Sequence, residues 1–558
     1  MPQPMMPSGH DRPDMTEAGT PPAPVTPGAG AEAAVAARPR GSRRAETRRP
    51  DRGWQAAGSI LPLLMVLAVQ AALSVRLVWA DTAFQDEATY LWAGHLQWAH
   101  WLHGTPIPPF PTYFSGAPVI YPPLGALADS VGGLAGARLL SLVFMLGATA
   151  LLWAAAGRLY GRRAAFFAAA LFAVSGPVLH LGAFATYDAL SVLLVALAAW
   201  CVIRAGDRGE GTGWMVTAGV ALAVANATAY ASALFDVVVL VLALLTAWPG
   251  GRRLAARRCA TLLIVVVVLV TAALLIGGKD YLTGVEQTTL ARVGAADPIP
   301  AVLAAAWSWT GLIVLLAIAG VIISWAGRRG WLPTLLLAVL AVAGLLGPLE
   351  QARLHTLASL NKHVGLGAWF AAVAAGYAID RFIAAAPAGR PQALTTAALI
   401  VALIFPLSLG ASQSRQFSTD WPNATSFIAI FGPLADHGNG RLLVETASIA
   451  RYYLPSGSQW QRWSSTRNIV MPSGASTGGP ASSAGVTGPG NRGVFAAFIT
   501  HGYFSYVVLN YTDTTALDYQ ITKDLRSSGH YKRVAVIPYG TEISPRGTYV
   551  VWRREGQP

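Results

Sequence analysis

Long apolar runs separated by short polar connections dominate residues 54–411. An α-helix needs about 17 to 25 mostly apolar residues to cross a bilayer, and each run reaches that length. The pattern therefore predicts a polytopic α-helical membrane domain with about eleven transmembrane helices. The runs lie near 56–80, 134–157, 164–181, 188–204, 214–230, 233–249, 259–278, 301–326, 331–347, 362–380 and 394–411.

The pattern changes after about residue 412, where short apolar stretches alternate with polar ones. A period of two with β-branched and aromatic residues indicates a strand, whereas a period near four indicates a helix. Residues 412–558 are therefore expected to form a small α/β domain, with a flexible Gly-, Ser- and Pro-rich insertion at 472–493. The expected strands are Arg441–Glu445, Ser505–Asn510, Arg533–Ile537 and Thr548–Trp552, and the expected helix is Thr514–Ser527.

The composition agrees with a membrane protein, because 54% of the residues are hydrophobic and only 12% are charged. An average soluble domain has roughly 25% charged residues. The net charge of +13 comes mostly from Arg, and the Arg clusters fall between apolar runs. This placement favours orientation in a bilayer over nucleic-acid binding, for which no basic stripe or recognition motif is present. Cys201 and Cys259 lie at or inside apolar runs, which argues against a disulfide framework or a thiolate metal site.

The Arg-rich connections predict the orientation, because cytoplasmic loops carry the excess of Lys and Arg. These connections fall on one side only if 214–249 is two helices, with a break near Asn226–Ser232. Residues 1–53, rich in Pro, Ala, Gly and Arg, are then a disordered cytoplasmic tail. The long first loop at 81–133 and the domain at 412–558 are expected on the extracytoplasmic side of a multi-pass plasma-membrane protein.

Two adjacent carboxylates, Asp86 and Glu87, follow the first apolar run by a few residues. A partly desolvated carboxylate at the outer interface is suited to take a proton from a hydroxyl group. The alternative is a solvated pair that only ends a helix.

Other residues expected on the extracytoplasmic side help to decide between a proton-accepting and a purely structural role for this pair. The element Tyr121-Pro122-Pro123 lies at the end of the first loop, and Asp188 begins the fourth helix. The helix dipole also favours an acid at that position for purely structural reasons. Asp129 and Arg138 are equally consistent with an ordinary interfacial ion pair.

The setting Phe84-x-Asp86-Glu87-x-x-Tyr90, the Pro-Pro-Leu element at 122–124, the acid at the fourth helix and the many spans resemble the GT-C membrane glycosyltransferases. The likeness is to the protein O-mannosyltransferase and aminoarabinose transferase branch. The resemblance implies a polyprenyl-phosphate-linked sugar donor in the membrane lipid and a protein, lipid or polysaccharide acceptor outside. It assigns Asp86 as the general base of an inverting transfer, with Glu87 tuning Asp86 or holding the loop.

Basic residues that match the departing lipid phosphate are found independently of the resemblance. Lys362 and His363 open the tenth expected helix from the outer side, and Arg353 precedes them in the same external loop. Such side chains bind phosphate well, although they also anchor helices at the interface. Lys279 is a weaker candidate for the same role. The chain departs from its expected relatives at Tyr121, where those relatives often have His or Lys.

Metal binding and two rival functions stay open from the sequence. No cofactor is certain, and a divalent metal ion is one alternative. However, His95, His100 and His103 match no compact ligand motif, so packing or interface roles are favoured for them. The rival functions are a multispanning transporter and a non-catalytic cell-envelope binding scaffold. A transporter would place charged residues near the bilayer midplane, whereas here they cluster at outer helix ends.

Overall fold

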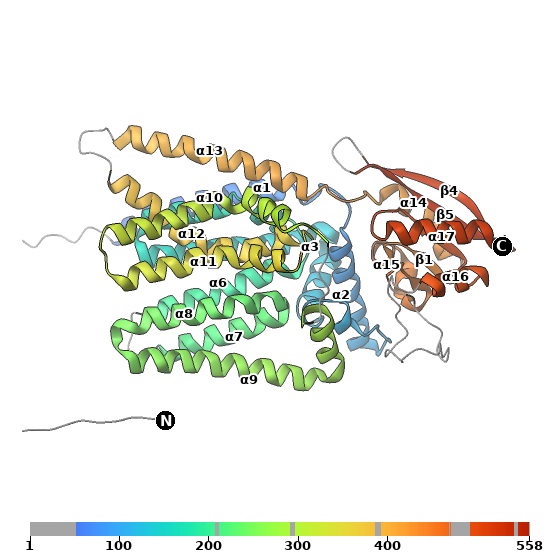
Figure 1. Ribbon diagram of the computed structural model, residues 1–558, viewed down its shortest axis with the longest axis horizontal. Helices are drawn as coiled ribbons and strands as arrows, with labels where there is room; N and C mark the ends of the chain where they lie inside the picture. Colours follow the sequence, from blue (N-terminus) through green and yellow to red (C-terminus); the bar gives the residue numbers. More distant parts are fainter. Residues whose placement is uncertain are drawn as a thin grey trace, which may run out of the picture. The chain divides into compact units, whose positions relative to one another are not determined.

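The structure is a computed structural model that describes residues 52–206, 211–290, 296–385, 392–467, 469, 492–540 and 545–556. The expected tail at 1–53 lies outside the described residues except for Arg52 and Gly53, which begin the first helix. The expected insertion at 472–493 also lies outside them except for Arg492 and Gly493. Within the described ranges, a helical bundle is followed by a small α/β domain (Figure 1).

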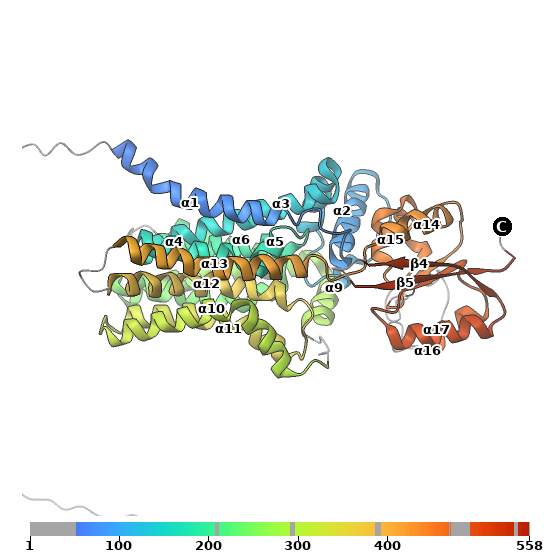
Figure 2. The same cartoon turned by 90° about the horizontal axis from the view of Figure 1, so that it is seen from above.

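The bundle contains helices that lie side by side in both views (Figure 1, Figure 2). Apolar segments form helices in a membrane because every backbone polar group is then satisfied within the segment. Each of the expected runs lies on one or two of the observed helices. The bounds are α1 (Arg52–Val75), α3 (Tyr121–Tyr160), α4 (Arg162–Ala173), α5 (Gly176–Leu181), α6 (Tyr187–Ala205), α7 (Thr212–Thr228), α8 (Asp236–Ala247), α9 (Arg252–Val285), α10 (Ile299–Ala326), α11 (Trp331–Arg353), α12 (Leu360–Ala384) and α13 (Gln392–Phe417).

Seven helical segments in the described part of the chain are long and apolar enough to cross a membrane, so the expected count of eleven is not confirmed. The run at 164–181 shows one reason, because it is divided into the short helices α4 and α5. Pro177 lies in the first turn of α5, where a residue without an amide hydrogen is well tolerated. The expected break within 214–249 is present, since η2 (Tyr230–Phe235) separates α7 from α8.

Helix α12 is the most enclosed of these candidate spans, whereas α9 is the most exposed. In the apolar window of α12, 78% of the residues are buried, compared with 6% in α9. The Gly- and Ala-rich sequence of α12 lets neighbouring backbones approach closely. A Cβ added to Gly367 would lie 2.5 Å from the oxygen of Ala343 in α11. One added to Gly376 would lie 2.3 Å from the oxygen of Ala164 in α4. Close packing therefore fixes the position of α12, whose first turn contributes to the site described below.

The segment between α1 and α3 lies at one end of the bundle (Figure 2). Helix α2 (Gln85–His103) includes the helix expected around Leu91–Leu102. It packs against the start of α3, where a Cβ on Gly94 would lie 2.0 Å from the oxygen of Pro122. The non-helical residue Gly133 (φ 61°) divides α3 at the expected end of the first loop. Short turns complete the chain: the 3-10 turns η1 (Phe110–Thr112), η3 (Trp248–Gly250), η5 (Pro455–Ser458) and η6 (Trp460–Arg462), and the π turn η4 (Glu286–Leu290).

The C-terminal domain is built on a five-stranded sheet with the order β2-β1-β3-β5-β4. Strand β1 is parallel to β2 and β3, whereas β5 is antiparallel to β3 and β4. The strands expected from the sequence are β1, β3, β4 and β5, and the short β2 was not expected. The bounds are β1 (Leu442–Val444), β2 (Trp463–Ser464), β3 (Tyr506–Leu509), β4 (Tyr531–Tyr539) and β5 (Gly547–Arg554).

Helices cover both faces of this sheet. One face packs against α14 (Thr425–Asp436) and α15 (Ala447–Tyr453), and the other packs against α16 (Arg492–Thr500) and α17 (Thr515–Ser527) (Figure 2). Strand β1 is buried on both sides: Leu442 and Val444 belong to the first core, and Leu443 belongs to the second. This explains its continuous apolar sequence, which is typical of a parallel strand covered on both faces.

Hydrogen bonds join the C-terminal domain to the first loop. The hydroxyl of Tyr453 accepts from the amide of Ala83 at 2.7 Å, and that of Tyr452 donates to Asp129 at 2.6 Å. The indole of Trp92 donates to the oxygen of Gly457 at 3.0 Å. The domain is thus held directly over the stretch that contains Asp86.

Candidate active site

Asp86 and Lys362 form an ion pair, although they lie on different helices far apart in the chain. The ammonium nitrogen of Lys362 donates to Asp86 Oδ2 at 2.6 Å. Asp86 lies in the first turn of α2, and Lys362 lies in the first turn of α12. The Lys362 side chain is only 7% exposed, whereas that of Asp86 is 32% exposed. The carboxylate is therefore accessible while its partner is enclosed.

Asp188 completes this charged cluster from a third helix. It lies in the first turn of α6, and its Oδ2 is 3.9 Å from the nitrogen of Lys362. The hydroxyl of Thr186 donates to the same oxygen at 2.8 Å. Asp188 is 8% exposed, so it is much less accessible than Asp86. The N-terminal ends of α2 and α6 favour the two acids, and these acids in turn compensate the ammonium group at the start of α12.

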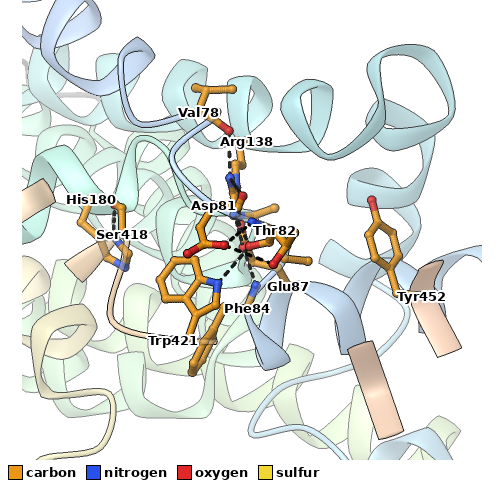
Figure 3. A network of polar contacts seen from close by, with 12 residues as sticks. Val78, Asp81, Thr82, Phe84, Glu87, Arg138, His180, Ser418, Trp421 and Tyr452 are labelled. Atoms are coloured by element: carbon orange, nitrogen blue, oxygen red, sulfur yellow. Dashed lines mark hydrogen bonds and ion pairs between the residues drawn. The ribbon is translucent and has the colours of Figure 1, made fainter. Parts of the chain in front are cut away.

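Glu87 has a different environment from its neighbour Asp86. It forms a bidentate ion pair with Arg138 of α3, with Nε to Oε1 at 2.8 Å and Nη2 to Oε2 at 2.6 Å (Figure 3). Both side chains are almost fully buried. Glu87 also accepts from the backbone amides of Phe84 at 3.0 Å and Ala185 at 2.8 Å. Its two oxygens are therefore fully engaged in holding the loop.

The remaining donors of Arg138 bind the backbone that follows α1. They reach the oxygens of Val78 at 2.8 Å, Asp81 at 3.0 Å and Thr82 at 3.2 Å (Figure 3). The interfacial pair of Asp129 with Arg138 considered above does not form. Asp129 instead contacts His95 at 2.6 Å and Tyr452. Arg138 thus links the backbone at the start of the first loop to Glu87.

Residues after α13 cover the other side of the loop. The indole of Trp421 donates to the oxygen of Thr82 at 2.9 Å, and its ring lies 5.2 Å from that of Phe84 (Figure 3). Asn423 donates to Asp81 Oδ1 at 2.7 Å. Burial raises the pKa of Asp81, and the hydrogen bonds from Thr82 and Asn423 oppose that rise.

The other expected site residues occupy supporting positions. Tyr121 is fully buried and meets Tyr90 edge to face at 6.3 Å. The oxygen of Pro123 accepts from the indole of Trp98 at 2.9 Å, and Pro122 contacts α2 through its oxygen, as noted above. The Tyr121-Pro122-Pro123 element therefore packs against α2 and helps to fix its position.

Two of the expected phosphate ligands have other partners in this structure. His363 is hydrogen-bonded to Gln351. Arg353 is exposed and pairs with Glu350 through Nη2 at 2.6 Å and Nε at 2.9 Å. Of the expected basic residues, Lys362 is the one that the fold brings to Asp86.

Residues 126–276 match the family model described as dolichyl-phosphate-mannose-protein mannosyltransferase. No curated protein sequence matches the chain. The structure is similar to ArnT from Cupriavidus metallidurans bound to undecaprenyl phosphate, with 15% identity, a TM-score of 0.52, and coverage of 88% of this chain and 97% of that one. Its fold is that of the GT-C membrane glycosyltransferases.

Two further GT-C structures are similar over most of this chain. The oligosaccharyltransferase of Archaeoglobus fulgidus has 13% identity and a TM-score of 0.54, with coverage of 89% of this chain and 75% of that one. The arabinofuranosyltransferase AftD from Mycobacteria has 18% identity and a TM-score of 0.50, with coverage of 88% and 40%. At these identities the likeness concerns the fold. It confirms the GT-C fold that the first-loop motif suggested.

The cluster around Asp86 does not fit a divalent metal ion. The ammonium group of Lys362 already lies between Asp86 and Asp188, where a bridging cation would have to lie. Among the described residues, no group of three or more His, Cys, Asp or Glu side chains is arranged to hold a metal ion. We therefore derive no step through a metal.

Three contributors to this candidate site were missed by sequence reasoning. They are Arg138 as the partner of Glu87, Thr186 as the partner of Asp188, and Trp421 as the cover of Phe84. Thr186 was detectable, because a hydroxyl residue directly before a helix is a common helix-start signal. Arg138 and Trp421 lie far along the chain from the residues that they contact, and no local pattern signals those contacts.

Proposed function

We propose that the protein transfers a sugar from a polyprenyl-phosphate donor to an acceptor hydroxyl on the extracytoplasmic side of the plasma membrane. One observation carries the proposal. Asp86 is the accessible carboxylate of the cluster, at 32% exposure, whereas Asp188 is 8% exposed and Glu87 is fully buried. A general base must be reached by the proton that it accepts, and Asp86 meets that condition.

Asp86 is the general base in this mechanism. Its carboxylate takes the proton of the acceptor hydroxyl while the hydroxyl oxygen forms a bond to the anomeric carbon. The bond between that carbon and the phosphate oxygen breaks, and its electron pair leaves with polyprenyl phosphate. Attack opposite the leaving group inverts the configuration at the anomeric carbon. The leaving phosphate is a stable anion, so it needs a cation more than a proton.

Lys362 supplies that cation. An ammonium group on a flexible stem has three donors and can turn between neighbouring acceptors. In the structure it pairs with Asp86, with Asp188 close by at 3.9 Å. When the donor phosphate binds, Lys362 turns toward it, Asp188 keeps the ammonium group within the site, and Asp86 becomes free to accept a proton.

Glu87 positions Asp86 and takes no part in proton transfer. All its contacts go to Arg138 and to two backbone amides, as described above. These contacts support the loop-holding role over a second base. His363 and Arg353 remain candidates for contacts to the lipid donor once it is bound.

The lipid phosphates bound in two similar structures support a lipid-linked donor. ArnT was solved with undecaprenyl phosphate, and the archaeal AglB was solved with dolichol-phosphate and an inhibitory peptide. The acceptor of the present protein is proposed to be a protein, a lipid or a polysaccharide, a choice taken up below. The Arg distribution between the helices supports a cytoplasmic N-terminus and an extracytoplasmic C-terminal domain.

The test is transfer from a radiolabelled polyprenyl-phosphate sugar by purified full-length protein in membrane nanodiscs. Replacing Asp86 with Asn should lower the rate by about 10²- to 10⁴-fold, which is the usual contribution of a general base. Binding of the lipid donor should be retained or tightened, because Asp86 no longer competes with the phosphate for Lys362. A cooperative thermal unfolding transition would show that the variant is folded. A folded Asp86→Asn protein that transfers sugar at the wild-type rate would remove Asp86 as the base and favour a transporter or a binding scaffold.

A further inference from the structure

A cavity of about 230 Å³ lies at the carboxyl ends of the parallel strands β1 and β3. After β1 the chain turns through α15 to β2 on one side, and after β3 it turns through α17 to β4 at the opposite edge. In open α/β sheets, ligands usually bind where the connections after two neighbouring parallel strands run to opposite edges of the sheet. The ends of these two strands and the segments that follow them form one side of the cavity. Its residues are Val444, Thr446, Ile449, Val508, Asn510, Thr512 and Asp513.

The opposite wall of the cavity belongs to the first loop and to the segment after α13. Phe84 and Gln85 line it, and Asp86 is the next residue in the chain. Asp420, Trp421 and Pro422 complete this wall. One wall of the crevice therefore belongs to the same stretch of chain as the residue proposed as the general base.

The side chains around the cavity favour an uncharged, hydroxyl-rich ligand. Aromatic rings of Phe84, Trp421 and Tyr549 contribute apolar surface, against which the C–H faces of sugar rings can pack. Phe427 also lines the cavity, but its ring is stacked on those of Tyr549 and Phe431. Gln85, Asn510 and Thr446 offer amide and hydroxyl groups for hydrogen bonds. A concave wall that combines aromatic rings with several polar groups suits a small ligand that has both C–H faces and hydroxyl groups.

Charge at the cavity argues against an anionic ligand. The lining side chains include two acids, Asp420 and Asp513, and none of them is basic. Asp513 is paired with Arg467 at 2.6 Å, while Asp420 is exposed. A phosphate or uronate would be repelled there, whereas carboxylates readily accept hydrogen bonds from sugar hydroxyls.

The wall after β3 is rigidly held by Glu445. Its carboxylate accepts from the consecutive backbone amides of Asn510 and Tyr511 at 2.6 Å each, Thr512 at 2.8 Å and Asp513 at 2.6 Å. A binding wall that is ordered before the ligand arrives loses little conformational entropy on binding. The loop is therefore preorganised.

We propose that this crevice binds the acceptor, and that the acceptor is a neutral oligosaccharide whose terminal hydroxyl reaches Asp86. The inference rests on the proposed function, because it names the acceptor class of the same reaction. It assigns the C-terminal domain a binding role, with Gln85 and Asp420 as specificity-determining contacts.

The test measures binding separately from transfer. Saturation-transfer NMR on the full-length protein in nanodiscs would use neutral mannan, arabinan and galactan pentasaccharides as probes, with a Ser/Thr-rich peptide of similar length for comparison. At least one pentasaccharide should bind, and the peptide should not. Gln85→Ala and Asp420→Ala should each weaken that binding about tenfold and raise the acceptor KM, with the affinity for the lipid donor unchanged. Glu555→Ala, which removes an exposed acid of the same domain outside the cavity, should bind like wild type.

The outcomes separate this inference from the proposed function. Asp86→Asn should bind the pentasaccharide normally while losing transfer. If the peptide binds and accepts sugar in an Asp86-dependent reaction, or if no pentasaccharide binds, the oligosaccharide inference fails and the proposed function stands. If pentasaccharides bind in the crevice but Asp86→Asn still transfers sugar, the crevice stands and the proposed mechanism fails. Binding that neither Gln85→Ala nor Asp420→Ala changes would overturn the assignment of the crevice.

Discussion

Lys362 lies 2.6 Å from Asp86, so the cation proposed for the leaving phosphate is paired with the proposed base in the unliganded protein. An ammonium group held this close competes for the lone pairs that a base needs. The arrangement makes base activity depend on the donor, because the lipid phosphate must draw Lys362 away before Asp86 can accept a proton.

The first prediction concerns Lys362. Lys362→Ala should weaken binding of polyprenyl phosphate about 10- to 100-fold, because a charge-assisted hydrogen bond to an anion is lost. Lys362→Arg should keep part of the affinity. Isothermal titration of polyprenyl phosphate into the nanodisc protein measures both. Lys523→Ala, which removes an exposed lysine of α17, is the control and should behave like wild type. Equal affinity of wild type and Lys362→Ala would place the phosphate site elsewhere.

The second prediction concerns the buried pair of Glu87 with Arg138. Glu87→Gln leaves the guanidinium buried without its counter-charge, and breaking such a pair costs about 3–5 kcal/mol of stability. Thermal unfolding followed by tryptophan fluorescence should show a clear fall in the unfolding temperature. Glu350→Gln, in the exposed pair with Arg353, is the comparison and should leave that temperature nearly unchanged. A stable Glu87→Gln protein that has lost transfer would instead point to a chemical role for Glu87.

The third prediction concerns pH and the C-terminal domain. Burial, and next the nearby charge of Glu445, raise the pKa of Asp518 to about 8. The unfolded chain therefore releases this proton near pH 4, whereas the folded domain keeps it until about pH 8. Stability should fall as the pH rises from about 4 to about 8 and then level off. Hydrogen exchange of the amides bound to Glu445, corrected for intrinsic exchange rates, measures the effect.

Asp518→Asn supplies the control for the pH experiment, because an amide has no proton to release in this range. The variant should show a flatter dependence of amide protection on pH between 4 and 8. An equally steep dependence in Asp518→Asn would assign the effect to another group.

The fourth prediction concerns metal ions. Because Lys362 lies between Asp86 and Asp188, extensive treatment with a chelator should leave the transfer rate within about twofold of the untreated protein. The assay is the labelled-sugar transfer described above, with added Mg²⁺ and Mn²⁺ as the reciprocal test. A large loss that either ion restores would show a metal site that the unliganded arrangement does not present.

The sequence by itself determined the fold class and much of the site. Apolar runs of spanning length predicted the helices, and short stretches rich in apolar, β-branched and aromatic residues predicted β1, β3, β4 and β5, because both patterns follow from local geometry. It also indicated Asp86, Asp188 and Lys362 as separate residues at outer helix ends. Each of them lies in the first turn of its helix, where local sequence signals are strongest.

Only the tertiary structure decided how those residues act together. It gave Asp86 and Glu87 different environments by pairing Glu87 with Arg138, and it brought Lys362 rather than Arg353 to Asp86. It also brought the β1 and β3 crevice beside Phe84 and Gln85. These are contacts between segments far apart in the chain, and they depend on how helices and domains pack. The Asp86-Glu87 motif can therefore be recognised from local sequence, whereas the different partners of its two carboxylates are set by packing.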